Sequence, residues 1–70
     1  MSEEGWQDRL RAELAEVENR LAKLDGFMAS EAYYDLNVVD RSLLMDQASA
    51  MHQYKRVLII RVERLGHAAS

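Results

Sequence analysis

The 70-residue chain, with a mass of 8.1 kDa, is small enough to be a single domain whose own hydrophobic core contributes only a few kcal/mol. It has no cysteine, which excludes disulfides and thiolate metal sites. It has only two histidines, His52 and His67. The formal net charge of −3 argues against general binding to DNA or to anionic membranes. Oligomerisation is the remaining way to stabilise so small a domain.

The first predicted element is an amphipathic helix over about residues 3–28. Its apolar residues recur at alternating steps of four and three, which places them on one helix face. Ser2 is a suitable N-cap, and the acidic residues that follow it suit the positive end of the helix dipole. The expected core residues are Trp6, Leu10, Leu14, Val17, Leu21, Leu24 and Met28.

A second amphipathic helix is predicted over about residues 38–65, with Asn37 as its N-cap and Asp40 reaching back to that cap. Gly66 is expected to end the helix, and residues 66–70 are expected to form a tail. The expected core residues of this helix are Leu44, Ala48, Met51, Tyr54, Leu58, Val62 and Leu65.

Residues 29–37 are predicted to form a short connection in which Ser30 caps one helical turn. Opposed residues in an antiparallel helix pair keep a constant sum of residue numbers. The pairs that share one sum are Met28–Leu44, Leu21–Met51, Leu14–Leu58 and Leu10–Val62. This agreement predicts an all-α antiparallel helical hairpin, in one domain over residues 1–70. A continuous helix through the connection, giving a long rod, is the alternative.

The second helix has more apolar residues than one hairpin seam can bury. A second line of them recurs at intervals of seven, and two tyrosines lie at the expected hairpin tip. We therefore expect two hairpins to pair into a homodimeric four-helix bundle. The predicted partner interface comprises Tyr33, Tyr34, Met45, His52, Ile59 and Ile60.

Charge is spread unevenly, with an excess of acids in residues 1–25 and of bases in residues 55–65. The basic stretch and a neighbouring tyrosine form a candidate anion site, for which a signalling nucleotide bound between subunits is the expected ligand. The alternative is a solvated helix end whose positive charge suits the helix dipole. The candidate anion contacts are Tyr54, Lys55, Arg56, Arg61 and Arg64.

No arrangement of residues predicts catalysis. Glu13, Glu16 and Glu18 belong to the expected solvent face of the first helix. His52 has no cysteine or acid three or four positions away, so it makes a poor metal ligand. The sequence has neither a glycine-rich phosphate loop nor a serine nucleophile motif, so no catalytic, cofactor or metal residue is predicted.

Short stretches over nearly the whole chain carry a family resemblance. They are Trp6-Gln7-Asp8-Arg9-Leu10, Lys23-Leu24, Phe27-Met28, Asp40-Arg41-Ser42-Leu43-Leu44, Gln47, Met51, Tyr54, Val57-Leu58 and Arg61-Val62. They resemble short phage-encoded two-helix proteins related to a small protein of crAss-like phages. That family often has proline at the position of Asn37 and polar residues at Ile59 and Ile60. The resemblance implies a phage accessory protein, a class that commonly inhibits host regulation or defence, and implies no catalytic residues.

The leading hypothesis is a homodimeric module that binds and inhibits or redirects a bacterial host protein. The alternatives are an oligomeric sponge for a signalling nucleotide and a structural module whose only activity is self-association. The acidic start of the chain is unlike a signal peptide, and no apolar stretch approaches the ~20 residues of a membrane span. We therefore expect the cytoplasm of a bacterial host as its location, with no DNA or membrane partner.

Overall fold

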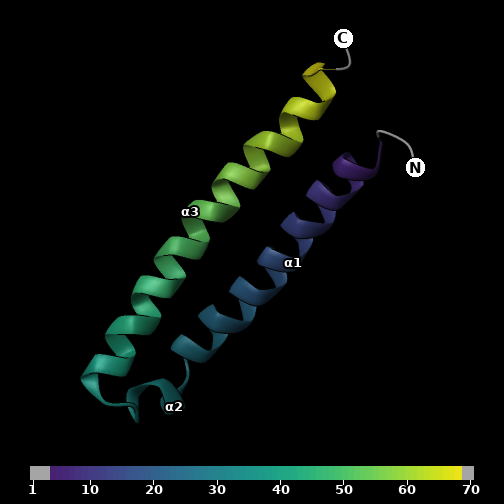
Figure 1. Cartoon of the computed structure of the whole chain (residues 1–70). Helices are drawn as coiled ribbons and strands as arrows, with labels where there is room; N and C mark the ends of the chain where they lie inside the picture. Colours follow the sequence, from purple (N-terminus) through teal and green to yellow (C-terminus); the bar gives the residue numbers. More distant parts are fainter. Residues whose placement is uncertain (1–3, 69–70) are drawn as a thin grey trace.

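The computed structural model describes residues 4–68, and three helices account for nearly all of them. Helix α1 spans Glu4–Met28, α2 is a single turn at Glu31–Tyr34, and α3 spans Val38–Ala68. Helices α1 and α3 run antiparallel, with α2 at the closed end (Figure 1). The predicted all-α class is confirmed, and the chain is a hairpin rather than a rod.

The sequence predicts that Ser2 caps the start of the first helix and that the second helix ends at Gly66. The predicted N-cap Ser2 lies outside the described residues. Helix α3 does not end at Gly66 but continues to Ala68, because a single glycine in a helix costs only about 1 kcal/mol relative to alanine. None of the helices within residues 4–68 is long and apolar enough to cross a membrane.

Local hydrogen bonds determine where the chain turns. The Asp40 backbone N–H donates to Asn37 Oδ1 at 2.9 Å, and the Asn37 side-chain amide donates to Asp40 Oδ2 at 3.0 Å. Asn37 therefore caps α3 as predicted. The Ser30 hydroxyl instead donates to the Phe27 carbonyl at 2.6 Å and makes no side-chain cap on α2. Ser30 thus occupies the N-cap position of α2 through its backbone, while its hydroxyl bonds back to the end of α1.

The core is a single seam between α1 and α3. The buried seam residues are Leu10, Val17, Leu21, Ala48 and Leu58, and the half-buried ones are Leu14, Leu24, Met28, Leu44, Met51, Val62 and Leu65. Two contacts flank the seam: Tyr54 with Glu13, and His52 with Asp25. Opposed residues in an antiparallel pair keep a constant sum of residue numbers. That sum is lower for Tyr54–Glu13, and higher by the same amount for His52–Asp25, than for the predicted core pairs. Contacts on both flanks therefore agree with the predicted register.

The core prediction is wrong for two residues. The side chains of Trp6 and Tyr54 are 47% and 46% exposed. The steps of three and four along each seam pass through their neighbours Gln7 and Lys55, which are half-buried. One residue turns a helix by about 100°, so Trp6 and Tyr54 lie beside the seam rather than in it.

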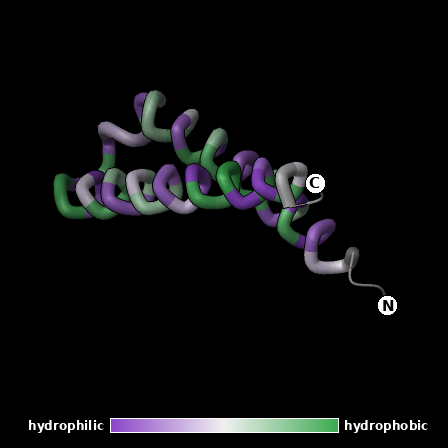
Figure 2. The backbone as a smooth tube through the Cα atoms, turned by 90° about the horizontal axis from the view of Figure 1, so that it is seen from above, coloured by the Kyte–Doolittle hydropathy of each residue, from purple (hydrophilic) through white to green (hydrophobic). Residues whose placement is uncertain are grey.

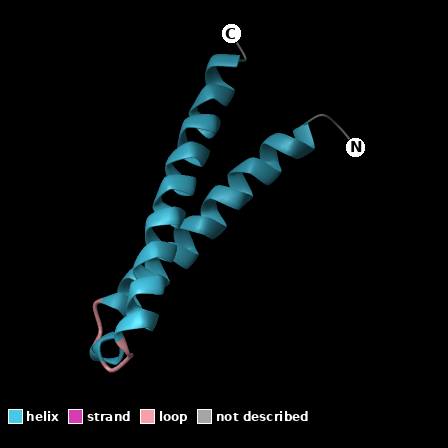
Figure 3. Ribbon diagram, turned by 60° about the vertical axis from the view of Figure 1, so that its left-hand side comes forward, coloured by secondary structure: helices cyan, strands magenta, loops and turns pink. Residues whose placement is uncertain are grey.

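The hairpin is elongated, with a Cα radius of gyration of 15.9 Å and extents of 50 × 19 × 15 Å. A compact 70-residue domain would have a radius of gyration of about 11 Å. Helices α1 and α3 diverge toward the end that carries both termini (Figure 3). Hydrophobic positions recur along the whole length of the tube (Figure 2). Two helices bury one face each, so much apolar surface is left outside the seam.

Candidate ligand site at the hairpin tip

An open hollow of about 310 Å³ lies at the closed end of the hairpin. It is formed where α2 packs beside the first turns of α3. Aromatic, apolar and polar side chains, with one positive charge, share its lining. The residues that line it are Tyr33, Tyr34, Val38, Arg41, Ser42 and Met45.

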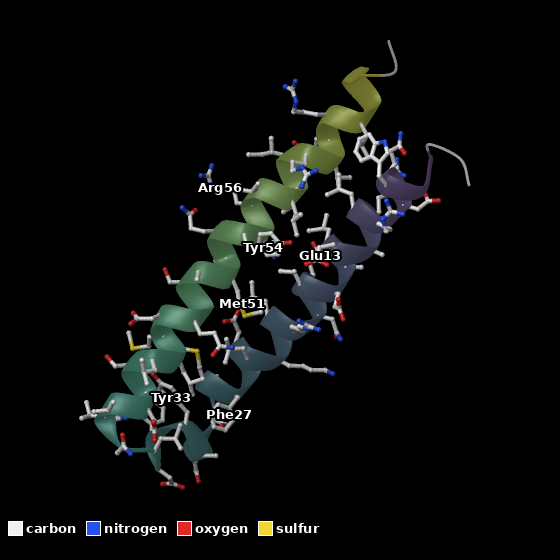
Figure 4. The ribbon with its side chains drawn as sticks, viewed as in Figure 1. Glu13, Phe27, Tyr33, Met51, Tyr54 and Arg56 are labelled. Carbon is white, nitrogen blue, oxygen red and sulfur yellow. The ribbon has the colours of Figure 1, made fainter. Side chains whose placement is uncertain are left out.

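Tyr33 fixes the wall of this hollow. Its side chain is only 6% exposed, and its hydroxyl donates to the Arg41 backbone carbonyl at 3.2 Å. Its ring packs edge-to-face against Phe27 and Tyr34, with centroid distances of 6.3 and 5.1 Å. Figure 4 shows Tyr33 and Phe27 together at the closed end. Tyr33 thus joins α1, α2 and α3, while Tyr34 stays 65% exposed at the rim.

Arg41 supplies the positive charge of the hollow. Its side chain is half-buried, and its Nε is buried without a hydrogen-bond partner. None of the ion pairs within residues 4–68 involves Arg41. A buried N–H without an acceptor costs about 1–3 kcal/mol, more for a charged group. A guanidinium binds carboxylate or phosphate through parallel hydrogen bonds, so Arg41 is the group of the hollow that would hold an anion.

The structure does not gather the predicted anion contacts of α3 into one site. Tyr54 and Glu13 point toward one another between the helices, whereas Arg56 extends from the outer side of α3 (Figure 4). Lys55 is half-buried at the seam, and Arg56 Nε donates to Gln53 Oε1 at 3.3 Å. Arg61 and Arg64 are exposed.

Tyr54 is committed to a contact within the hairpin. Its hydroxyl donates to Glu13 Oε2 at 2.9 Å. This hydrogen bond raises the pKa of Tyr54 above its ordinary value of 10.0, with smaller contributions from desolvation and from the charge of Glu13. The positive charge of Arg61 opposes the rise in pKa. Arg61 is therefore close enough to act on Tyr54, whereas Arg56 extends from the outer side of α3.

The predicted partner interface is divided between two places. Tyr33, Tyr34 and Met45 meet at the tip, although Tyr33 is buried and unavailable to a partner. Farther along α3, His52 Nε2 lies 3.3 Å from Asp25 Oδ2. There, Ile59 is half-buried and Ile60 is 43% exposed. Adjacent isoleucines thus face different directions, as predicted.

Sequence reasoning missed three residues of the hollow, namely Val38, Arg41 and Ser42. One available signal was the position of Arg41, which precedes Leu44 by three and Ala48 by seven. A basic residue at such a position extends the seam and is half-buried next to the tip. Within residues 4–68, no group of three or more His, Cys, Asp or Glu side chains is placed to hold a metal ion.

The family model for Sequestin matches residues 4–64. The chain belongs to the Sequestin family. This match covers α1, the whole tip and most of α3, so every residue that lines the hollow falls within it. No curated protein and no solved structure matches the chain.

Proposed function

We propose that this Sequestin-family chain is a non-catalytic protein that sequesters a small signalling nucleotide at the hairpin tip. The observation that carries the proposal is the Arg41 side chain, which lines a hollow walled by tyrosines and joins none of the ion pairs within residues 4–68. The family name supports it, because the name denotes holding a target rather than converting it. The resemblance to phage accessory proteins supports a role in the cytoplasm of a bacterial host, and the apolar surface outside the seam supports a homodimer.

The chemistry of the hollow suits a nucleotide. The Arg41 guanidinium would bind phosphate oxygens, and the Ser42 hydroxyl would add a donor. The exposed ring of Tyr34 offers a surface on which a base stacks, an interaction worth about 1–3 kcal/mol. The volume of about 310 Å³ is at the lower end of small-molecule sites, which matches one nucleotide unit.

Sequestration requires only binding. A protein of this kind lowers the free concentration of a signal when its sites outnumber the signal molecules and its Kd lies below the signalling concentration. A homodimer would carry two tips and hence two sites.

Binding of a host protein is the second candidate function. The observation that favours it is the exposure of Tyr34 and Val38, 65% and 68%, beside the same hollow. Exposed aromatic residues on a loop are common anchors of protein interfaces. In this case the tip would dock onto a protein surface, and inhibition would follow from occupying that surface.

Calorimetry with a panel of cyclic and linear nucleotides tests the proposal. At least one nucleotide is expected to bind and to raise the melting temperature by mass action. Arg41→Ala is expected to weaken binding by about 1.5–3 kcal/mol, the contribution of a charge-assisted hydrogen bond. Arg56→Ala is the matched control, because Arg56 extends from the outer side of α3.

If no nucleotide of the panel binds, or if Arg41→Ala and Arg56→Ala behave alike, the nucleotide proposal is wrong. The second candidate then predicts that a tagged chain retains one host protein and that Tyr34→Ala abolishes its retention.

A further inference from the structure

One flank of the hairpin carries exposed apolar side chains on both α1 and α3. On α1, the residues Trp6, Glu13, Arg20 and Phe27 recur at intervals of seven and so share one line along the helix. Glu13 contacts Tyr54 across the seam, which places this α1 line and Tyr54 on the same flank. Leu43, Ala50, Val57 and Arg64 form the adjacent line on α3, again at intervals of seven, so this line is apolar except at its end.

Much of this flank is apolar and open to solvent. The exposed fractions are 47% for Trp6, 38% for Phe27, 60% for Leu43, 46% for Tyr54 and 46% for Val57. We call these five residues the Trp6 flank.

The opposite flank is different. It is marked by the contact of His52 with Asp25. There the corresponding line on α1 is charged throughout, with Arg11, Glu18 and Asp25. Charged residues are depleted from the cores of protein interfaces. The Trp6 flank is therefore the better interface, although the sequence analysis placed it along Met45, His52 and Ile59.

The surface area of the chain is large enough for one partner interface. The hairpin exposes 5419 Å², whereas a compact monomer of this mass exposes about 4,500 Å². The excess of about 900 Å² is close to the ~800 Å² that each partner buries in an interface of standard size.

We infer that the Trp6 flank packs against the same flank of a second copy, about a two-fold axis near the middle of α1. In an antiparallel pairing of the two α1 lines, Trp6 lies level with the partner subunit's Phe27, and Glu13 with the partner subunit's Arg20. Each aromatic residue then meets an aromatic residue, and each charge meets its opposite. The line is thus complementary to itself, as an isologous interface requires. This inference is independent of the ligand site at the tip.

Light scattering over a concentration series, with Trp6 fluorescence, tests the interface. The chain is expected to be a dimer whose tryptophan emission shifts to the red as dilution separates the copies. Val57→Glu is expected to raise the dimer Kd by at least about tenfold, since it buries a charge at the interface. Met45→Glu is the matched control, because Met45 is 56% exposed but lies on the opposite flank of α3.

A charge exchange gives a second, gentler test. Glu13→Arg and Arg20→Glu alone are each expected to weaken the dimer, and the double variant is expected to restore it in part, because the exchange also removes the Tyr54–Glu13 hydrogen bond and the Glu16–Arg20 ion pair within each hairpin. Circular dichroism establishes that each variant remains helical. A chain that stays monomeric at every concentration would overturn the inference. Dimers that are lost with Met45→Glu and kept with Val57→Glu would also overturn it, as would a double variant no better than the single ones.

Discussion

The phenolic oxygen of Tyr54 lies 2.9 Å from Glu13 Oε2 and joins the middle of α3 to α1. Far apart in sequence, these residues meet on the flank of the seam, where positions next to the core of antiparallel helices face one another. The contact assigns Tyr54 a role in holding the hairpin together rather than in the predicted core or anion site.

This contact predicts a loss of stability at high pH. The pKa of Tyr54 is raised in the folded chain above its ordinary value of 10.0, so between pH 10 and the folded pKa the unfolded chain binds fewer protons. The contribution of the Tyr54–Glu13 hydrogen bond to stability is complete below pH 10. It is lost as pH rises through the pKa of Tyr54 in the folded chain. Urea unfolding at several pH values is expected to show a smaller decline for Tyr54→Phe than for the parent chain. Equal slopes for the two proteins would contradict the prediction.

Leu58 is the most deeply buried residue of the described core, at 1% exposure. Leu58→Ala is expected to reduce the free energy of unfolding by about 2–5 kcal/mol, because it removes apolar contacts and leaves a cavity. Lys23→Ala, at an exposed position of α1, is the control and is expected to change stability by no more than about 0.5 kcal/mol. Urea unfolding at a fixed protein concentration measures both, and a tolerated Leu58→Ala would mean that the seam is not the core.

Asn37 provides a local test of the turn. Asn37→Ala removes the acceptor of the Asp40 N–H and is expected to cost about 0.5–2 kcal/mol of unfolding free energy. Asn19→Ala is the matched control, because Asn19 is an exposed residue in the middle of α1. The melting temperatures of the two variants compare the sites directly. A cost equal to that of Asn19→Ala would show that the cap does not stabilise α3.

Lys55 is a basic residue at an apolar position. It is half-buried at the seam, where the register places it level with Val17. Lys55→Met is expected to stabilise the chain by about 1 kcal/mol, because it exchanges a partly desolvated charge for apolar contact. The same variant is expected to leave nucleotide binding at the tip unchanged, as calorimetry would show. Weaker binding with Lys55→Met would instead favour the anion site predicted on α3.

The sequence by itself determined the helices, their antiparallel pairing and their register. These follow from local rules: the repeat of three and four in α1 and α3, the Asn37 cap, and matched apolar layers. The family resemblance seen in motifs along the chain agrees in its extent with the Sequestin match over residues 4–64.

Only the tertiary structure decided which of two adjacent residues enters the seam. Gln7 rather than Trp6 and Lys55 rather than Tyr54 face the opposite helix, because the packing of whole helices sets their rotation and outweighs the hydrophobicity of one side chain. The hollow likewise depends on α2, which brings Tyr33 against the backbone of Arg41. No periodicity spans that turn, so the sequence pattern indicates a half-buried Arg41 near the tip but not the hollow that α2 and α3 form around it.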